Sequence, residues 1–341
     1  MKLHRTISAL ILSLLIVLAM IPVSSVYGAE AIDITESVYL TLNCRYGDKP
    51  VQGKTFNAYR LADVDKYGRI TPIKEKGFDN FNLGISGKDD EGWRSTAAAL
   101  ESYVLAKNIK ADGKAVSDEK GIATFSGLQQ GLYLVIDSRM TMGNVRYEIS
   151  PVIVQLPMAD TDTNSWKYNV TSDVKGEIIP VSPSQPDSQY TDITVTKGWE
   201  DNDDEYKVRP SEVRVYLLKE GDVIDQAVLN RENNWKHTWK NLDKRYSYTV
   251  AEDIVEYYSP QLEREGYEFA LINTYYDSSI EPGPSGDINV PDGSDSPDAS
   301  GTGSPDSGKL PQTGSLWWPV PVLTAAGLIL VCAGVMRRRR S

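Results

Sequence analysis

The chain has 341 residues, a formal net charge of −11 at pH 7 and only two cysteines and two histidines. An acidic balance of this size argues against nucleic acid as a partner and for a well-solvated exterior. Two histidines, one of them His4 near the N-terminus, are too few for a zinc site built on several histidines or for a hydrolase that needs one, so we expect no metal and no cofactor.

The N-terminal segment predicts export. Lys2 and Arg5 precede an apolar run from about Ile7 to Ile21, and small residues follow around Ala29. Charged, apolar and small residues in this order are typical of a secretory signal peptide, which we place at 1–29 with the cut within 28–31. An uncleaved anchor helix fits less well because the apolar run is short.

Residues 30–175 predict a β-sandwich domain with a short helical insertion. Apolar strands such as 38–42 and 131–136 alternate with turn-rich segments. A helix is expected at 95–107, where Leu100 and Val104 lie on one face. The stretch 176–191 contains three prolines among serines, and we expect it to be a linker.

Residues 192–276 predict a second, compact all-β domain with three polar side chains facing its core. Side chains alternate along a strand, so Lys197 shares the apolar face of its strand, and the same holds for Glu252 and Asn273. Burying an isolated ion would cost several kcal/mol, so these groups need one another.

Two arrangements would remove that cost. The first is a buried ion pair between Lys197 and Glu252, with Asn273 hydrogen-bonded beside it. In the second, burial lowers the pKa of the lysine and raises that of the acid, which leaves a neutral amine and a protonated carboxyl. The amine then attacks the side-chain carbonyl of Asn273, ammonia leaves, and an amide cross-link remains.

An acidic loop at 200–205 invites a calcium hypothesis. Asp201, Asp203, Glu205 and Glu212 have the spacing of an EF-hand, but Tyr206 stands where that loop requires glycine. We therefore predict a solvated acidic loop and no metal site.

The C-terminal part predicts a spacer followed by an anchor. Residues 277–309 are dominated by Gly, Ser, Pro and Asp, which indicates a disordered spacer. The apolar stretch 316–336 is long enough to cross a bilayer, and it is closed by the four arginines 337–340.

The segment 310–341 resembles the cell-wall sorting signal of Gram-positive surface proteins. The motif Leu310-Pro311-Gln312-Thr313-Gly314 directly precedes the apolar span and basic tail. The resemblance implies that a sortase cleaves between Thr313 and Gly314, and that an amine of peptidoglycan or of another pilin takes over the acyl group. The membrane would then hold the chain only transiently before sorting. Since Cys332 leaves with the tail, Cys44 would be the one remaining thiol, without a disulfide partner.

The second domain resembles Cna B-type domains. The matching segments are 195–201, 209–215, 239–242, 248–252 and 272–275, which together span most of 192–276. The resemblance implies an immunoglobulin-like β-sandwich in which Lys197 bonds to Asn273, with Glu252 as the promoting acid. On this basis we favour the isopeptide bond over the ion pair.

The first domain resembles the N-terminal domain of sortase-assembled pilins, in segments such as 53–64 and 150–157. The resemblance implies Asp137 as a candidate acid and Asn169 as a candidate amide. No lysine occupies the first strand, so a second isopeptide bond is not expected. In pilin shafts a lysine that follows a Trp-x-x-x-Val spacing accepts the next subunit. Lys175 keeps that spacing and is a candidate acceptor, although an ordinary solvent-facing lysine fits equally well.

These inferences predict tandem immunoglobulin-like sandwich domains on a secreted, wall-anchored chain. The expected function is structural, as a subunit of a sortase-assembled pilus with sortase, other pilins and peptidoglycan as partners. The alternative is a monomeric wall-anchored adhesin that binds host surface or matrix proteins. An enzyme acting on outside substrates is not expected, because the sequence offers no convergent set of catalytic groups.

Overall fold

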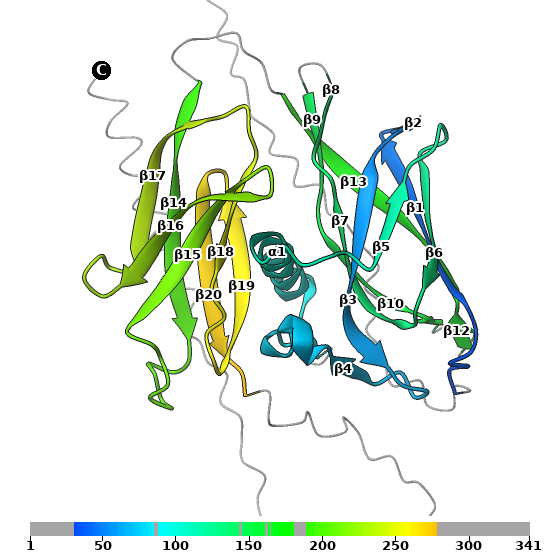
Figure 1. Cartoon of the computed structure of the whole chain (residues 1–341), viewed down its shortest axis with the longest axis horizontal. Helices are drawn as coiled ribbons and strands as arrows, with labels where there is room; N and C mark the ends of the chain where they lie inside the picture. Colours follow the sequence, from blue (N-terminus) through cyan, green and yellow to red (C-terminus); the bar gives the residue numbers. More distant parts are fainter. Residues whose placement is uncertain are drawn as a thin grey trace, which may run out of the picture. The chain divides into compact units, whose positions relative to one another are not determined.

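Alternating apolar side chains build the described part of the chain into β-sandwiches. A computed structural model describes residues 31–84, 88–142, 145–160, 163, 165–180 and 189–277. Within them the chain forms two immunoglobulin-like β-sandwich domains, the first with one α-helix, which confirms the predicted fold class (Figure 1). All of these residues belong to one compact unit.

Two facing sheets form the first domain. The larger has the order β2-β1-β13-β9-β8, and β6 also pairs with β1. Its strands are β1 (Val38–Tyr46), β2 (Lys49–Pro50), β6 (Ile122–Leu128), β8 (Met140–Met142), β9 (Val145–Ile149) and β13 (Asn169–Pro180). The second sheet has the order β10-β7-β3-β4, with β5 on β3. Its strands are β3 (Thr55–Val64), β4 (Ile70–Pro72), β5 (Gly113–Val116), β7 (Gly131–Asp137) and β10 (Val152–Leu156). A small hairpin adds β11 (Met158–Asp160) and β12 (Ser165–Lys167).

The second domain is a smaller sandwich. One sheet has the order β17-β14-β20-β19 and the other β16-β15-β18. The strands of the first are β14 (Tyr190–Glu200), β17 (Lys236–Asp243), β19 (Tyr258–Glu265) and β20 (Glu268–Tyr275). Those of the second are β15 (Glu212–Lys219), β16 (Asp222–Asn230) and β18 (Tyr248–Glu252).

The predicted linker is shorter than expected. Strand β13 continues past residue 175 to Pro180, because its last residues pair with β9, and β14 begins at Tyr190. Ile178 and Ile179 give this segment strand character that the nearby prolines obscured in the sequence.

The helical insertion consists of the short 3₁₀ turns η1 (Lys74–Lys76) and η2 (Phe78–Asn80) and the helix α1 (Asp90–Ala106). Helix α1 starts earlier than predicted because the carboxylate of Asp89 accepts a hydrogen bond from the N–H of Gly92 at 2.8 Å and caps the first turn. It contacts β7 and β10 of the first domain and also β18 and β19 of the second. One hydrophobic cluster therefore runs from Leu134 through Leu100 into the second core at Val250.

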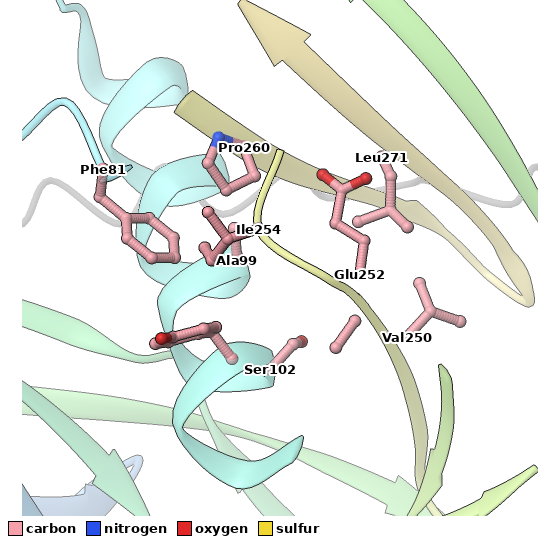
Figure 2. Close-up of a pocket in the computed structure, with 10 residues that line it drawn as sticks. Phe81, Ala99, Ser102, Val250, Glu252, Ile254, Pro260 and Leu271 are labelled. Atoms are coloured by element: carbon pink, nitrogen blue, oxygen red, sulfur yellow. The ribbon is translucent and has the colours of Figure 1, made fainter. Parts of the chain in front are cut away.

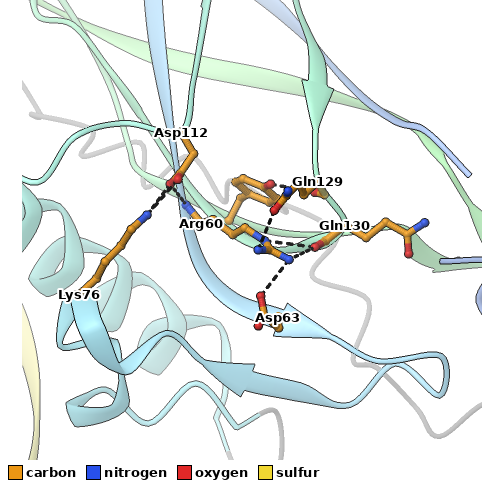
Figure 3. Close-up of polar contacts among 7 residues, drawn as sticks. Arg60, Asp63, Lys76, Asp112, Gln129 and Gln130 are labelled. Carbon is orange, nitrogen blue, oxygen red and sulfur yellow. Dashed lines mark hydrogen bonds and ion pairs between the residues drawn. The ribbon is translucent and has the colours of Figure 1, made fainter. Parts of the chain in front are cut away.

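A polar network joins the helical insertion to the first sandwich (Figure 3). Arg60 of β3 donates from its guanidinium to the side chain of Gln129 at 3.0 Å and to the carbonyl of Gln130 at 2.6 Å. Its backbone N–H donates to Asp112, which also pairs with Lys76 of η1 at 2.8 Å. These bonds connect η1, β3 and the turn before β7.

Candidate functional site

Lys197 lies in the core of the second domain. It follows the inward-facing, fully buried Ile193 and Val195 on β14, and strand alternation turns its side chain to the same face. The Lys197 side chain is 0% exposed. Its Nζ donates to the carbonyl oxygens of Leu271 at 3.0 Å and Gly198 at 3.2 Å, and lies 4.6 Å from the ring centroid of Trp199.

Glu252 faces this lysine from the opposite sheet. It ends β18, where it pairs with Val215 of β15, and its side chain is 4% exposed. Oε2 of Glu252 lies 3.4 Å from Nζ of Lys197. Neither carboxylate oxygen has a hydrogen-bond partner of ordinary geometry among the residues that the structure describes.

Asn273 completes the group from the last strand. Strands β14 and β20 run parallel, with Lys197 opposite Leu271 and Trp199 opposite Asn273. Asn273 is 1% exposed, and its Oδ1 accepts no hydrogen bond within the described part of the chain. An amine, an acid and an amide are thus buried together in the core of one sandwich.

Burial shifts the pKa values of Lys197 and Glu252 so that the neutral form of each is favoured. It lowers the pKa of Lys197 from its ordinary value of 10.5 to about 8, against the opposing attraction of Glu252. Burial also raises the pKa of Glu252, against the opposing effect of the Lys197 amine. Both shifts favour a neutral nucleophile beside a protonated acid, which is the state that amide formation requires.

Aromatic side chains pack around Trp199, the ring next to Lys197. The Trp199 ring packs edge-on against Tyr258 at 4.9 Å and Trp235 at 5.4 Å between centroids. The hydroxyl of Tyr258 donates to Asp201 at 2.8 Å, and Nε of Arg209 donates to the same carboxylate at 3.0 Å. The expectation of a solvated acidic loop is therefore wrong for Asp201, which is buried and paired.

The first domain contains a buried lysine that the sequence analysis missed. Lys54 precedes β3, is 0% exposed, and forms an ion pair with Asp137, whose side chain is 4% exposed. Its Nζ also donates to the carbonyl of Tyr147 at 2.7 Å. The signal was present in the sequence, because Lys54 alternates with the core residues Phe56 and Ala58.

The structure does not bring Asn169 to this pair. Asn169 is exposed at the start of β13, opposite Tyr39, whereas Tyr147 pairs with Ile178 near the other end of the same strand. The two positions are about 30 Å apart along β13. Cys44 is a free, buried thiol, and burial raises its pKa to about 11.

The candidate acceptor Lys175 lies within β13, opposite Arg45 of β1, and not directly before a linker. The predicted signal peptide 1–29, the predicted spacer beyond Asp277, the motif at 310–314 and the predicted span 316–336 lie outside the described residues. Among the described residues, no helix has the length and apolar character needed to cross a membrane.

Comparison with known proteins finds a family match within the second domain. Residues 193–274 match the family model of the Cna protein B-type domain. The collagen adhesin of Staphylococcus aureus is 35% identical over 120 residues, which cover 32% of this chain and 10% of that protein. The chain therefore spans about a tenth of that relative's length.

Solved structures of similar proteins have lower sequence identity. A single B repeat unit of the collagen-binding surface protein of Staphylococcus aureus is 18% identical, covering 71% of this chain and 100% of the repeat, with a TM-score of 0.25. The full-length major pilin SpaD of Corynebacterium diphtheriae is 15% identical, covering 71% of this chain and 65% of the pilin, with a TM-score of 0.29. The segment 193–274 is thus similar in sequence to the Cna protein B-type domain, and the two-sheet sandwich that it forms agrees with this similarity.

Proposed function

We propose that this chain is a structural subunit of a sortase-assembled pilus, held together internally by a Lys197–Asn273 isopeptide bond and attached covalently through Thr313. The Cna B-type domain and the sorting motif support this proposal. Its place is the cell wall or pilus surface of the exporting cell, with sortase, other pilin subunits and peptidoglycan as partners. The chain catalyses nothing except its own cross-linking.

The observation that carries the isopeptide is the meeting of Lys197, Glu252 and Asn273 in one core. The neutral amine of Lys197 attacks the side-chain carbonyl carbon of Asn273, forming a C–N bond. The protonated Glu252 polarises that carbonyl and passes protons from the attacking nitrogen to the departing one. The C–Nδ2 bond of Asn273 breaks, and one ammonia leaves for each amide formed.

Intact-mass measurement of the exported chain tests this chemistry. The expected mass is that calculated for the processed chain from its own two termini, less one ammonia. Glu252→Gln keeps the size of the side chain but removes the acid, so this variant should have its full calculated mass, with no ammonia lost. Glu256→Gln, at an exposed position nearby, serves as the matched control and should still lose ammonia. An unaltered chain at full mass would contradict the isopeptide and leave only a buried ion pair.

A wall-anchored monomeric adhesin is the second candidate function. It is favoured by the identity with a relative named as a collagen adhesin, which suggests host surface or matrix proteins as partners. Wall extracts distinguish the two candidates. A pilus subunit should give a ladder of high-mass species that Thr313→Ala abolishes, whereas an adhesin should give a single wall-linked band.

The ladder also tests Lys175 as the acceptor. Lys175→Ala should abolish the ladder if this amine receives the next subunit's threonine. Lys167→Ala changes an exposed lysine of the neighbouring hairpin and should leave the ladder intact. A ladder that survives Lys175→Ala would assign the acceptor to another lysine.

A further inference from the structure

Strand β18, which carries Glu252, is buried on both faces although it is an edge strand. It ends the sheet β16-β15-β18, yet all five of its residues are buried. Tyr248 and Val250 belong to the hydrophobic core together with Leu271. Thr249 and Ala251 point the opposite way, because side chains alternate along a strand. The second domain's own core therefore does not account for their burial.

Helix α1 of the first domain covers this outer face. Oγ of Ser102 lies 3.0 Å from Oγ1 of Thr249 in a buried hydrogen bond. At the C-terminal end of the helix, the C-cap residue Lys107 donates to the side chain of Asp253 at 2.8 Å, and Asp253 directly follows Glu252 in the chain. The contact is thus made along the length of β18.

Two further bonds join the domains away from the helix. The backbone N–H of Asn82 donates to Oγ of Ser259 on β19 at 2.9 Å. On the other side, Nη1 of Arg146 in β9 donates to the carbonyl of Arg245, just before β18, at 3.0 Å. Contacts on several elements therefore hold the helix against the second domain.

A small cavity connects the helix to the cross-linking site (Figure 2). Phe81, Ala99 and Ser102 line it from the first domain, and Glu252, Pro260 and Leu271 line it from the second. The carbonyl of Leu271 accepts the hydrogen bond from Nζ of Lys197. First-domain residues are therefore part of the wall that separates the reacting groups from solvent.

The chemistry depends on that separation. Water reaching Glu252 through the cavity would stabilise its carboxylate and, beside it, the ammonium form of Lys197. Charged in this way, the lysine has no lone pair for attack and the acid has no proton to donate.

We propose that helix α1 acts as a lid on the second domain, so that the Lys197–Asn273 amide forms at full rate only when the first domain is docked. This inference rests on the proposed isopeptide. It makes Ala99 and Ser102 positioning residues, which act on the reaction through Glu252. Cross-linking at full rate then requires that both domains have folded and that helix α1 is packed against the second domain.

The test follows ammonia loss over time in the full chain made by cell-free synthesis. Ala99→Arg places a long charged side chain in the contact from the helix side, and Thr249→Arg does so from the strand side. Arg94→Glu reverses a charge at an exposed position of the same helix and serves as the matched control. All variants are made in a background in which Trp93, Trp166, Trp317 and Trp318 are replaced by Phe, so that tryptophan fluorescence monitors folding of the second domain through Trp199, Trp235 and Trp239.

We expect both contact variants to cross-link at least about tenfold more slowly than the control, since each pKa unit that returns toward the ordinary value changes the reactive fraction about tenfold. The same result is expected if Ala99→Arg unfolds the first domain, because the lid is then lost as well. Cross-linking at the control rate in both variants, with the second domain folded, would overturn the lid but leave the isopeptide standing. Absence of ammonia loss in the unaltered chain would instead overturn the isopeptide itself.

Discussion

Asn273→Ala isolates what the cross-link contributes to the stability of the second domain. The substitution removes the carbonyl that is attacked and leaves Lys197 and Glu252 in place. The bond from 197 to 273 closes a loop of about 76 residues, and the chain-entropy relation for cross-links gives about 4.5 kcal/mol for a loop of this length. For a domain of this size, each kcal/mol corresponds to about 4–8 °C, so the Tm of the second domain should fall by about 20–35 °C.

Differential scanning calorimetry at pH 7 measures this difference, with the intact mass determined on the same samples. Lys197→Met also lacks the cross-link and should fall by a similar amount. Thr196→Ala, at the exposed neighbouring position of β14, should leave the Tm nearly unchanged. A fall of less than about 5 °C, in a comparison where the unaltered chain has lost ammonia, would refute the loop-closure reasoning.

Three further predictions follow from the same electrostatics and capping contacts. In Asn273→Ala, the unfolded chain binds the Lys197 proton more tightly than the folded chain, so the free energy of unfolding should rise between pH 8 and 10.5, by up to about 3 kcal/mol in urea titrations. A flat profile over that window would show that Lys197 is solvated. Asp137→Ala should cost the first domain about 3–5 kcal/mol because it leaves Lys54 buried and unpaired, and the double variant Lys54→Met/Asp137→Leu should recover most of that loss in thermal unfolding. Asp89→Ala should cost about 1 kcal/mol by removing the N-cap of α1, whereas the exposed Glu91→Ala should cost less.

Strand alternation was sufficient to predict burial of the three residues of the candidate site. The period of two is a fixed property of extended backbone, so one apolar neighbour at i±2 determines the face of Lys197, Glu252 or Asn273. Which strands lie opposite each other depends on the pairing between segments far apart in the chain. The residue pattern within each strand does not reveal that pairing. The three residues could be assigned to one site only through the resemblance to Cna B-type domains.

Lys54 shows what strand alternation and the resemblance to Cna B-type domains do not predict. In the second domain the amine comes from the first strand, and the corresponding strand of the first domain, β1, carries no lysine. The structure supplies the amine from the residue before β3, next to Asp137, because β3 and β7 are paired with Phe56 opposite Asp137. This register is a tertiary property and could not be predicted from the spacing within either strand.

The contact between the domains was missed for a different reason. Ala99 and Ser102 are unremarkable helix residues, and their smallness becomes informative only once β18 is found against them. In the sequence, Leu100 and Val104 give the helix one apolar face, and the pattern predicts no second one. The second buried face depends on packing between segments about 150 residues apart, such as Ser102 and Thr249.

The two sandwiches should respond differently to a pulling force because their terminal strands are joined differently. In both domains the first and last strands are parallel neighbours, β1 with β13 and β14 with β20, so a force applied through the ends shears those pairs. The proposed amide would join β14 directly to β20 and carry the load covalently. In the first domain, the buried Lys54–Asp137 pair joins the start of β3 to β7 within one sheet, and the contacts between β1 and β13 are hydrogen bonds and apolar packing. Single-molecule pulling on the full chain should therefore extend the first domain but not residues 198–272, and Asn273→Ala should add that second extension. Two full extensions in the cross-linked chain would contradict this load path.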